Sequence, residues 1–146
     1  MVLYHMVNYC KLNAAARIIT GVRKYDHITP ILRDELHWLP VTQRITFRLC
    51  LTVYKALHGM TPSYIAEFCH PVAATHYRSR LRSATYGDLV VPRNCLELGK
   101  RAFAVAGPTV WNNLPLSVRL TPSITTFQTA LKTHLFSAAY GASKQQ

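Results

Sequence analysis

Residues 36–59 read LHWLPVTQRITFRLCLTVYKALHG, and this stretch carries both the start and the stop signals of a helix. Pro40 suits the first helical turn because a missing N–H costs nothing there. Gly59 suits the left-handed residue that ends a helix, and Pro62 prevents the helix from resuming. The stretch therefore predicts a helix between Pro40 and Gly59.

This predicted helix is apolar over most of its circumference. One face, at helical spacing, consists of Ile45, Leu49, Val53 and Ala56. That face is widened by Phe47, Cys50, Leu51, Tyr54 and Leu57. A helix of this kind needs neighbours on several sides, so we expect it to be the central helix of a small helical core. Its narrow polar stripe consists of Arg44, Arg48, Thr52 and Lys55. The three positive charges fit either a solvated face or contact with an anionic partner.

Charge is the most informative property of the composition. The 146 residues include 17 Lys and Arg against 6 Asp and Glu, and the formal net charge is +11. About half of the residues are hydrophobic, so one domain with a real core is expected. The charge favours a polyanionic partner such as nucleic acid over the plainer reading, a basic protein that is merely soluble.

The cysteines and the apolar runs indicate an intracellular protein. Cys10, Cys50, Cys69 and Cys95 form no C-x-x-C pair, which fits reduced and partly buried thiols. His5 and Asn8 interrupt the N-terminal apolar run, so it does not resemble a signal peptide. No apolar run approaches the ~20 residues of a membrane helix. We therefore expect a cytoplasmic or nuclear location and no membrane partner.

Helical patterns also precede and follow the central helix. Residues 1–20 have an apolar face and end at Gly21; the face consists of Leu12, Ala15, Ala16 and Ile19. Arg17, Arg23 and Lys24 gather at its C-terminal end, where they offset the helix dipole or contact nucleic acid. Thr29 and Thr61, each before a proline, predict two short helices. The last helix, capped by Ser123, has a stripe of Ile124, Phe127, Leu131 and Leu135.

Residues 71–123 differ in texture, being rich in turns, prolines and β-forming residues. Alternation over 78–83 and the run 89–93 predict two short strands. Residues 102–108 are expected to be extended, followed by a tight turn around a buried Trp111. The predicted fold is thus mainly α: a helical segment over 1–70, a second segment over 71–137 with short strands and a final helix, and a flexible tail over 138–146.

The best candidate for a binding site is the alternating run of Arg78, Arg80 and Arg82. A strand would place the three guanidinium groups on one face about 7 Å apart, close to the phosphate repeat of an extended nucleic-acid strand. Tyr77 and Tyr86 flank the run and could stack on bases. The alternative is an exposed edge strand that its charges protect from aggregation.

The residue patterns that several kinds of catalysis require do not occur in this sequence. Asp34 and Glu35 are adjacent, so on a helix they point in different directions, and no carboxylate pair has the spacing of a two-metal site. Phosphate-cradling glycine motifs and a G-x-S-x-G elbow are absent. Four residues could in principle bind zinc: Cys69, His70, His76 and Cys95. Their spacing is poor for a tetrahedral site, so neither a metal nor a cofactor is expected.

An ordered set of short motifs resembles a known family. The set begins with Leu12–Gly21, Tyr25–Pro30, Leu36–Val41 with Gln43–Ile45, and Tyr54–Gly59. It continues with Leu81–Ser83, Leu89–Arg93, Ala106–Pro108, Trp111–Asn112, Leu114–Pro115 and the closing helix Phe127–Phe136. In this order, over about residues 11–137, the motifs resemble the C-terminal region of the reverse transcriptase polyprotein of LINE-type, jockey-like non-LTR retrotransposons.

The resemblance implies thumb-like helices and a C-terminal segment downstream of a polymerase palm. The aromatic-x-Asp-Asp box of the palm is missing, since no two aspartates are adjacent, so polymerase activity is not carried over and we expect no enzyme. The thumb's grip on a template–primer backbone would fall to Arg17, Arg44 and Arg82, to which helix geometry adds Arg48 and Lys55. The expected ligand is RNA, DNA or their hybrid, bound without sequence specificity.

Two other hypotheses remain open at this stage. The apolar faces could dock on the polymerase palm of a parent polyprotein, which would make the chain a protein-interaction or structural piece. The chain could also be a fragment of a mobile element without a selected role.

Overall fold

A computed structural model describes residues 2–75, 80, 82 and 86–141, and its helix α2 (Val41–Leu57) occupies the stretch predicted between Pro40 and Gly59. The Pro40 carbonyl accepts the Arg44 N–H at 3.0 Å, which starts the helix. Gly59 has a φ of +68° and ends it. The Met60 N–H bonds to the Lys55 carbonyl at 2.8 Å and the Gly59 N–H to the Ala56 carbonyl at 3.3 Å, which is a Schellman motif.

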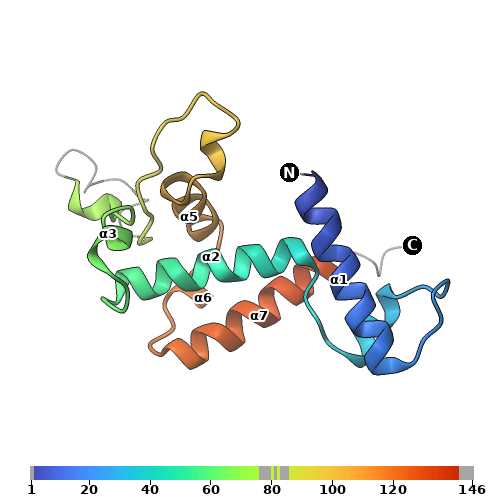
Figure 1. Ribbon diagram of the computed structural model, residues 1–146. Helices are drawn as coiled ribbons and strands as arrows, with labels where there is room; N and C mark the ends of the chain where they lie inside the picture. Colours follow the sequence, from blue (N-terminus) through green and yellow to red (C-terminus); the bar gives the residue numbers. More distant parts are fainter. Residues whose placement is uncertain (1, 76–79, 81, 83–85, 142–146) are drawn as a thin grey trace. The chain divides into compact units, whose positions relative to one another are not determined.

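The fold is mainly α, as predicted (Figure 1). Besides α2, the elements are α1 (Val2–Thr20), η1 (Ile31–Glu35), α3 (Ser63–Ala66), η2 (Val72–Ala74), η3 (Gly99–Arg101), α5 (Phe103–Asn112), α6 (Leu116–Arg119) and α7 (Ile124–Tyr140). In the part of the chain that the structure describes, none of the helices combines the length and apolarity needed to cross a bilayer.

The chain forms two compact units, and both α2 and α7 contribute to each of them. Unit 1 consists of Met1–Ile45 with Lys132–Gln146, and unit 2 consists of Thr46–Leu131. The predicted segments 1–70 and 71–137 follow the sequence, whereas each unit takes residues from both segments. α7 also continues through Tyr140, so residues 138–140 are helical and not part of a flexible tail.

Unit 1 is built around α1 and the turn of helix that follows it. Its buried core consists of Leu12, Ala16, Ile28, Leu32 and Val41, with Trp38 packed against them. Gly21 ends α1 with a φ of +69°, as predicted, but Ile19 is 62% exposed and does not join the apolar face. Thr29 is already helical, so it does not serve as the predicted N-cap of the short helix.

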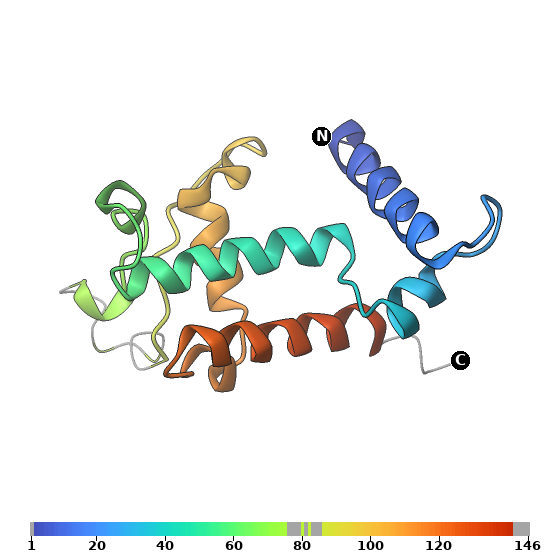
Figure 2. The same ribbon diagram turned by 60° about the horizontal axis from the view of Figure 1, so that its bottom comes forward.

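Unit 2 is built on aromatic contacts between α2 and α7, which lie side by side in both views (Figures 1 and 2). The rings of Tyr54 and Phe127 stack with centroids 4.3 Å apart, and Trp111 of α5 lies 6.0 Å from Phe127. Tyr54, Phe127 and Trp111 are buried, as are Cys50, Val53, Leu114, Val118 and Leu131. A Cβ on Gly107 would lie 3.2 Å from Val53, so the glycine lets α5 approach α2 closely.

The predicted pattern of α7 is confirmed. The Ser123 hydroxyl accepts the Thr126 N–H at 3.2 Å, which is an N-cap hydrogen bond. Phe127, Leu131 and Leu135 are buried on one face, and Ile124 is half-buried. On α2, by contrast, Ile45 of the predicted apolar face is 39% exposed.

The prediction of strands between residues 71 and 115 is largely wrong. Ala102–Pro108 is not extended, because α5 begins at Phe103 and carries Pro108 within it. Burial of Gly107, Pro108 and Trp111 on one side of this helix outweighs the cost of the proline. Trp111 itself is buried, as predicted.

The two short strands predicted over 78–83 and 89–93 do not form in the residues that the structure describes. Leu89 makes a single antiparallel bridge with Pro71, and the Val90 N–H bonds to the His70 carbonyl at 2.8 Å. Arg80 lies in a turn and Arg82 is helical, while 78, 79, 81 and 83 lie outside the described residues. Isolated pairing of this kind does not build a sheet, which needs neighbouring strands.

Replacing Phe127, the central aromatic side chain of unit 2, should strongly destabilise this unit. We expect Phe127→Ala to lower the free energy of unfolding by about 3–5 kcal/mol, because the ring is fully buried between aromatic neighbours. The control is Phe68→Ala, since Phe68 is 46% exposed, and it should cost far less. Urea denaturation measures both, and equal losses would contradict the assigned core.

The four cysteines should separate into two reactivity classes. All are free thiols; Cys10 and Cys95 are exposed, whereas Cys50 and Cys69 are buried. Burial raises the pKa of the Cys50 thiol to about 12 and also raises the pKa of Cys69. Ellman's reagent at pH 8 should therefore titrate two thiols quickly and the other two only after unfolding. Four equally fast thiols would be inconsistent with this core.

Candidate nucleic-acid interface

Arg17 at the end of α1 is engaged within the chain. Its guanidinium donates to the carbonyl oxygens of Arg23 and Asp26, the latter at 2.9 Å. The Asp26 carboxylate in turn accepts the Arg23 N–H at 3.2 Å. These bonds close the loop between α1 and η1, so the side chain has a structural task at a predicted nucleic-acid-binding position.

Arg44 has a comparable task in the corner before α2. Its Nε donates to the Leu39 carbonyl at 2.9 Å, and its guanidinium lies over the Trp38 ring, 5.3 Å from the centroid. This cation–π contact holds the chain where it enters α2. Arg17 and Arg44, the two residues of unit 1 that the resemblance names as phosphate-binding, thus stabilise turns of the chain.

Arg48 and Lys55 lie in unit 2, on the polar stripe predicted for α2. They are seven residues apart, two helical turns, and therefore share a face. Arg48 is exposed and Lys55 half-buried, and Thr52 between them donates its hydroxyl to the Arg48 carbonyl at 2.9 Å. Among the described residues, the ion pairs involve neither cation.

The arginine run retains two described members. Arg80 and Arg82 are both exposed, and Tyr86 after them is 48% exposed. Arg78 and Tyr77 lie outside the described residues. The turn and helical conformations of Arg80 and Arg82 do not give the 7 Å spacing of a strand, so the ladder of phosphate contacts predicted from alternation does not hold for this pair.

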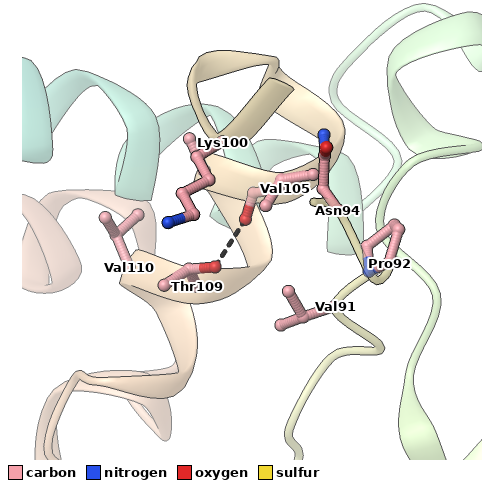
Figure 3. A pocket seen from close by; sticks show the side chains of 8 residues that line it. Val91, Pro92, Asn94, Lys100, Val105, Thr109 and Val110 are labelled. Carbon is pink, nitrogen blue, oxygen red and sulfur yellow. Dashed lines mark hydrogen bonds between the residues drawn. The ribbon is translucent and has the colours of Figure 1, made fainter. Parts of the chain in front are cut away.

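A second basic segment contains none of the predicted binding residues. Arg93, Lys100 and Arg101 are exposed, and Lys100 forms an ion pair with Glu97. The segment borders an apolar pocket of about 440 Å³ between the 91–94 stretch and α5 (Figure 3). The signal in the sequence is three positive charges within nine residues, but the strand predicted over 89–93 ends at Arg93 and does not include Lys100 and Arg101.

The acidic residues of unit 2 are few, and two of the three are engaged. Unit 2 contains nine Lys and Arg against Glu67, Asp88 and Glu97. Asp88 binds Arg119 at 2.6 Å, and this pair is the least exposed ion pair among the described residues. The remaining cations of unit 2 therefore give it a net positive surface.

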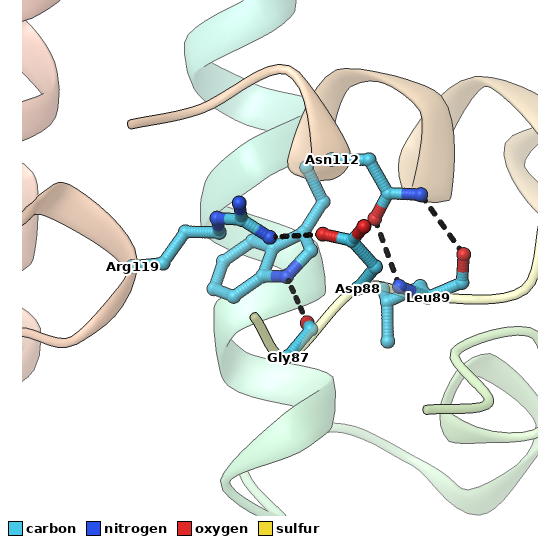
Figure 4. Close-up of polar contacts among 6 residues, drawn as sticks. Gly87, Asp88, Leu89, Asn112 and Arg119 are labelled. Carbon is cyan, nitrogen blue, oxygen red and sulfur yellow. Dashed lines mark hydrogen bonds and ion pairs between the residues drawn. The ribbon is translucent and has the colours of Figure 1, made fainter. Parts of the chain in front are cut away.

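Asp88 belongs to a polar network that fixes the 87–89 loop onto α5 and α6 (Figure 4). The Asn112 amide accepts the Leu89 N–H at 2.8 Å and donates to the Leu89 carbonyl at 2.9 Å. The Trp111 indole N–H donates to the Gly87 carbonyl at 3.3 Å. Trp111, Asn112 and Leu89 belong to the motifs of the resemblance, and here they join segments more than 20 residues apart.

The residues considered for zinc do not assemble in the described part of the chain. Cys69 is buried, Cys95 is exposed, and His76 lies outside the described residues. No group of three or more His, Cys, Asp or Glu suited to a metal ion occurs among the residues that the structure describes.

The comparisons with known proteins add no relative to this picture. No family model, no curated protein and no solved structure matches the chain.

The contribution of the Asn112 hydrogen bonds to stability can be tested against a substitution of the adjacent Asn113. We expect Asn112→Ala to lower the free energy of unfolding by about 1–3 kcal/mol, because it leaves the Leu89 N–H and carbonyl unpaired beside a buried side chain. Asn113→Ala changes an exposed residue and should be within about 0.5 kcal/mol of wild type. Chemical denaturation of both variants checks this, and equal stabilities would argue against the network.

Proposed function

We propose that the chain is a non-catalytic nucleic-acid-binding fragment that holds the sugar–phosphate backbone of RNA or an RNA–DNA hybrid without reading sequence. The observation that carries the proposal is the set of exposed guanidinium groups in unit 2 that take part in none of the described ion pairs. The set consists of Arg48, Arg80, Arg82, Arg93 and Arg101.

Arginine is the residue type best suited to this task. Its planar guanidinium matches two phosphate oxygens at once and stays charged at any physiological pH. Phosphate contacts fix position but carry no sequence information, so affinity would come from released counterions and fall as salt rises. Lys55, half-buried on the same face of α2 as Arg48, would add a further point charge.

We infer the origin of the fragment from the ordered motifs between residues 11 and 137. They support a place downstream of the palm in the reverse transcriptase polyprotein of a LINE-type retrotransposon, with the thumb's grip retained; the aromatic-x-Asp-Asp box of the palm does not occur in these 146 residues. The engaged side chains of Arg17 and Arg44 would then support the fold, and unit 2 would supply most of the contacts. A cytoplasmic or nuclear location is consistent with four free cysteines.

The test is fluorescence anisotropy with a labelled RNA–DNA hybrid across a salt series. Replacing four exposed arginines of unit 2 by glutamine, at positions 80, 82, 93 and 101, should lower the slope of log affinity against log salt by about 3. The reason is that each phosphate contact contributes about 0.7–0.9 to the slope, so the loss of four contacts removes about 3.

The matched control removes four charges from unit 1, at Lys11, Arg23, Lys24 and Lys132. It should change the slope less, because the proposed backbone contacts lie in unit 2. Two variants with equal slopes would show that net charge alone binds the hybrid. An affinity that stays constant between about 50 and 200 mM salt would contradict the backbone mechanism itself.

A second candidate function is favoured by exposed apolar side chains in the same segment. Leu96 and Leu98 are 71% and 76% exposed, and they lie in the chain between Asn94 and Lys100, which line the apolar pocket of Figure 3. Such a surface suits docking on another protein, and the palm of a parent polyprotein is the partner that the resemblance suggests. Size-exclusion chromatography distinguishes the two functions, because an orphaned apolar interface favours self-association and a monomer argues against it.

A further inference from the structure

A pocket of about 620 Å³ lies within unit 1, between the end of η1 and the last turns of α7. Its volume falls in the range of about 300–1,000 Å³ that small-ligand sites occupy. The side chains that matter for its chemistry are Arg33, Asp34, His37, Phe136 and Tyr140. It therefore offers both aromatic faces and charged groups to one ligand.

The aromatic part of the pocket suits a flat ring. The rings of His37 and Phe136 are within 21° of parallel, with centroids 6.0 Å apart. A base between them needs about 7 Å, twice the contact distance of stacked carbon atoms, so the exposed His37 ring would have to shift outward by about 1 Å to admit it. Tyr140 packs against Phe136 at 4.8 Å and is fixed because its hydroxyl donates to the Trp38 carbonyl at 3.0 Å.

The backbone conformation of His37 is a second observation that points to a ligand at this pocket. Its φ is +49°, and it is the only non-glycine residue with a positive φ in the described part of the chain. Glycine adopts this conformation freely, whereas a histidine here costs on the order of 1 kcal/mol. A ring held at the pocket under such strain is typical of a functional position.

The charged part of the pocket is preorganised and nearly neutral. Arg33 donates from Nε and Nη2 to the two Asp34 oxygens, at 2.7 and 2.8 Å. This bond lowers the pKa of Asp34, so the carboxylate stays ionised at neutral pH and orients the guanidinium. Two of the five guanidinium N–H donors are used, which leaves three for a ligand's oxygens.

We propose that this pocket takes one unpaired nucleobase of a single-stranded RNA or DNA segment, with the base stacked on His37 and Phe136 and Arg33 bonded to an adjacent phosphate oxygen. The inference rests on the proposed function and adds a base-dependent contact to the backbone grip of unit 2. Because Asp34 offsets the charge of Arg33, this contact depends on stacking and much less on salt.

The experiment compares a 12-nucleotide single strand with an abasic strand of the same length and charge. Wild type should bind the base-bearing strand about 5- to 150-fold more tightly, the range expected from one stacked base. His37→Gly removes the ring and also relieves the backbone strain, so it should fold at least as stably. It should lower the ratio severalfold through weaker binding of the base-bearing strand, because Phe136 is then the only one of the two rings left to stack on the base.

His27→Gly is the matched control, since His27 is an exposed histidine of the same unit outside the pocket, and it should keep the wild-type ratio. Phe136→Leu provides a second test from the opposite wall and should also reduce the ratio. Equal binding of the two strands by wild type would overturn the pocket and leave the backbone grip standing. A His37→Gly protein that keeps the full ratio would overturn the pocket as well. No binding of either strand at low salt would overturn the proposed function together with this inference.

Discussion

The stacking of Tyr54 on Phe127 is the contact on which unit 2 depends. Both rings are almost completely buried, and His58 covers the other face of Tyr54 with its centroid 4.0 Å away. The Tyr54 hydroxyl donates to the Thr121 carbonyl at 3.2 Å, which satisfies the only polar atom of this side chain. The stack joins α2 to a helix that begins about 70 residues later, and α5 then packs on both through Gly107 and Trp111.

Eight of the arginines fall into two classes by what surrounds them. Arg17, Arg44 and Arg119 donate to carbonyls or a carboxylate within the chain, where they close a loop, a helix entry and a polar network. Arg48, Arg80, Arg82, Arg93 and Arg101 are exposed and absent from the described ion pairs. The net charge of +11 therefore overestimates the positive charge that is available to bind phosphate, because some of the arginines stabilise the fold.

The base pocket and the exposed cations would contribute to binding through different physical terms. Phosphate contacts gain their free energy from released counterions, so they weaken with salt and are indifferent to bases. Stacking on His37 and Phe136 depends on a base and is little affected by salt. A chain that combined both would bind a base-bearing single strand more tightly than an abasic strand of equal charge, which exposed arginines alone would not do.

Sequence by itself determined the helices whose signals are local. Proline before α2, left-handed glycines after α1 and α2, and the Ser123 cap of α7 each act within a few residues of their own position. The sequence also predicted the buried stripe of Phe127, Leu131 and Leu135. It likewise identified Arg48, Arg80 and Arg82, which are exposed, as candidates for binding phosphate.

Tertiary structure alone decided the rest. Pro108 lies in a helix because Gly107 and Trp111 beside it are buried, and this burial gain is invisible in local propensity. The pairing of Asn112 with Leu89 and the closing of a pocket by His37 and Phe136 join residues 23 and 99 positions apart. Contacts at such separations follow from packing, and no periodicity along the chain encodes them.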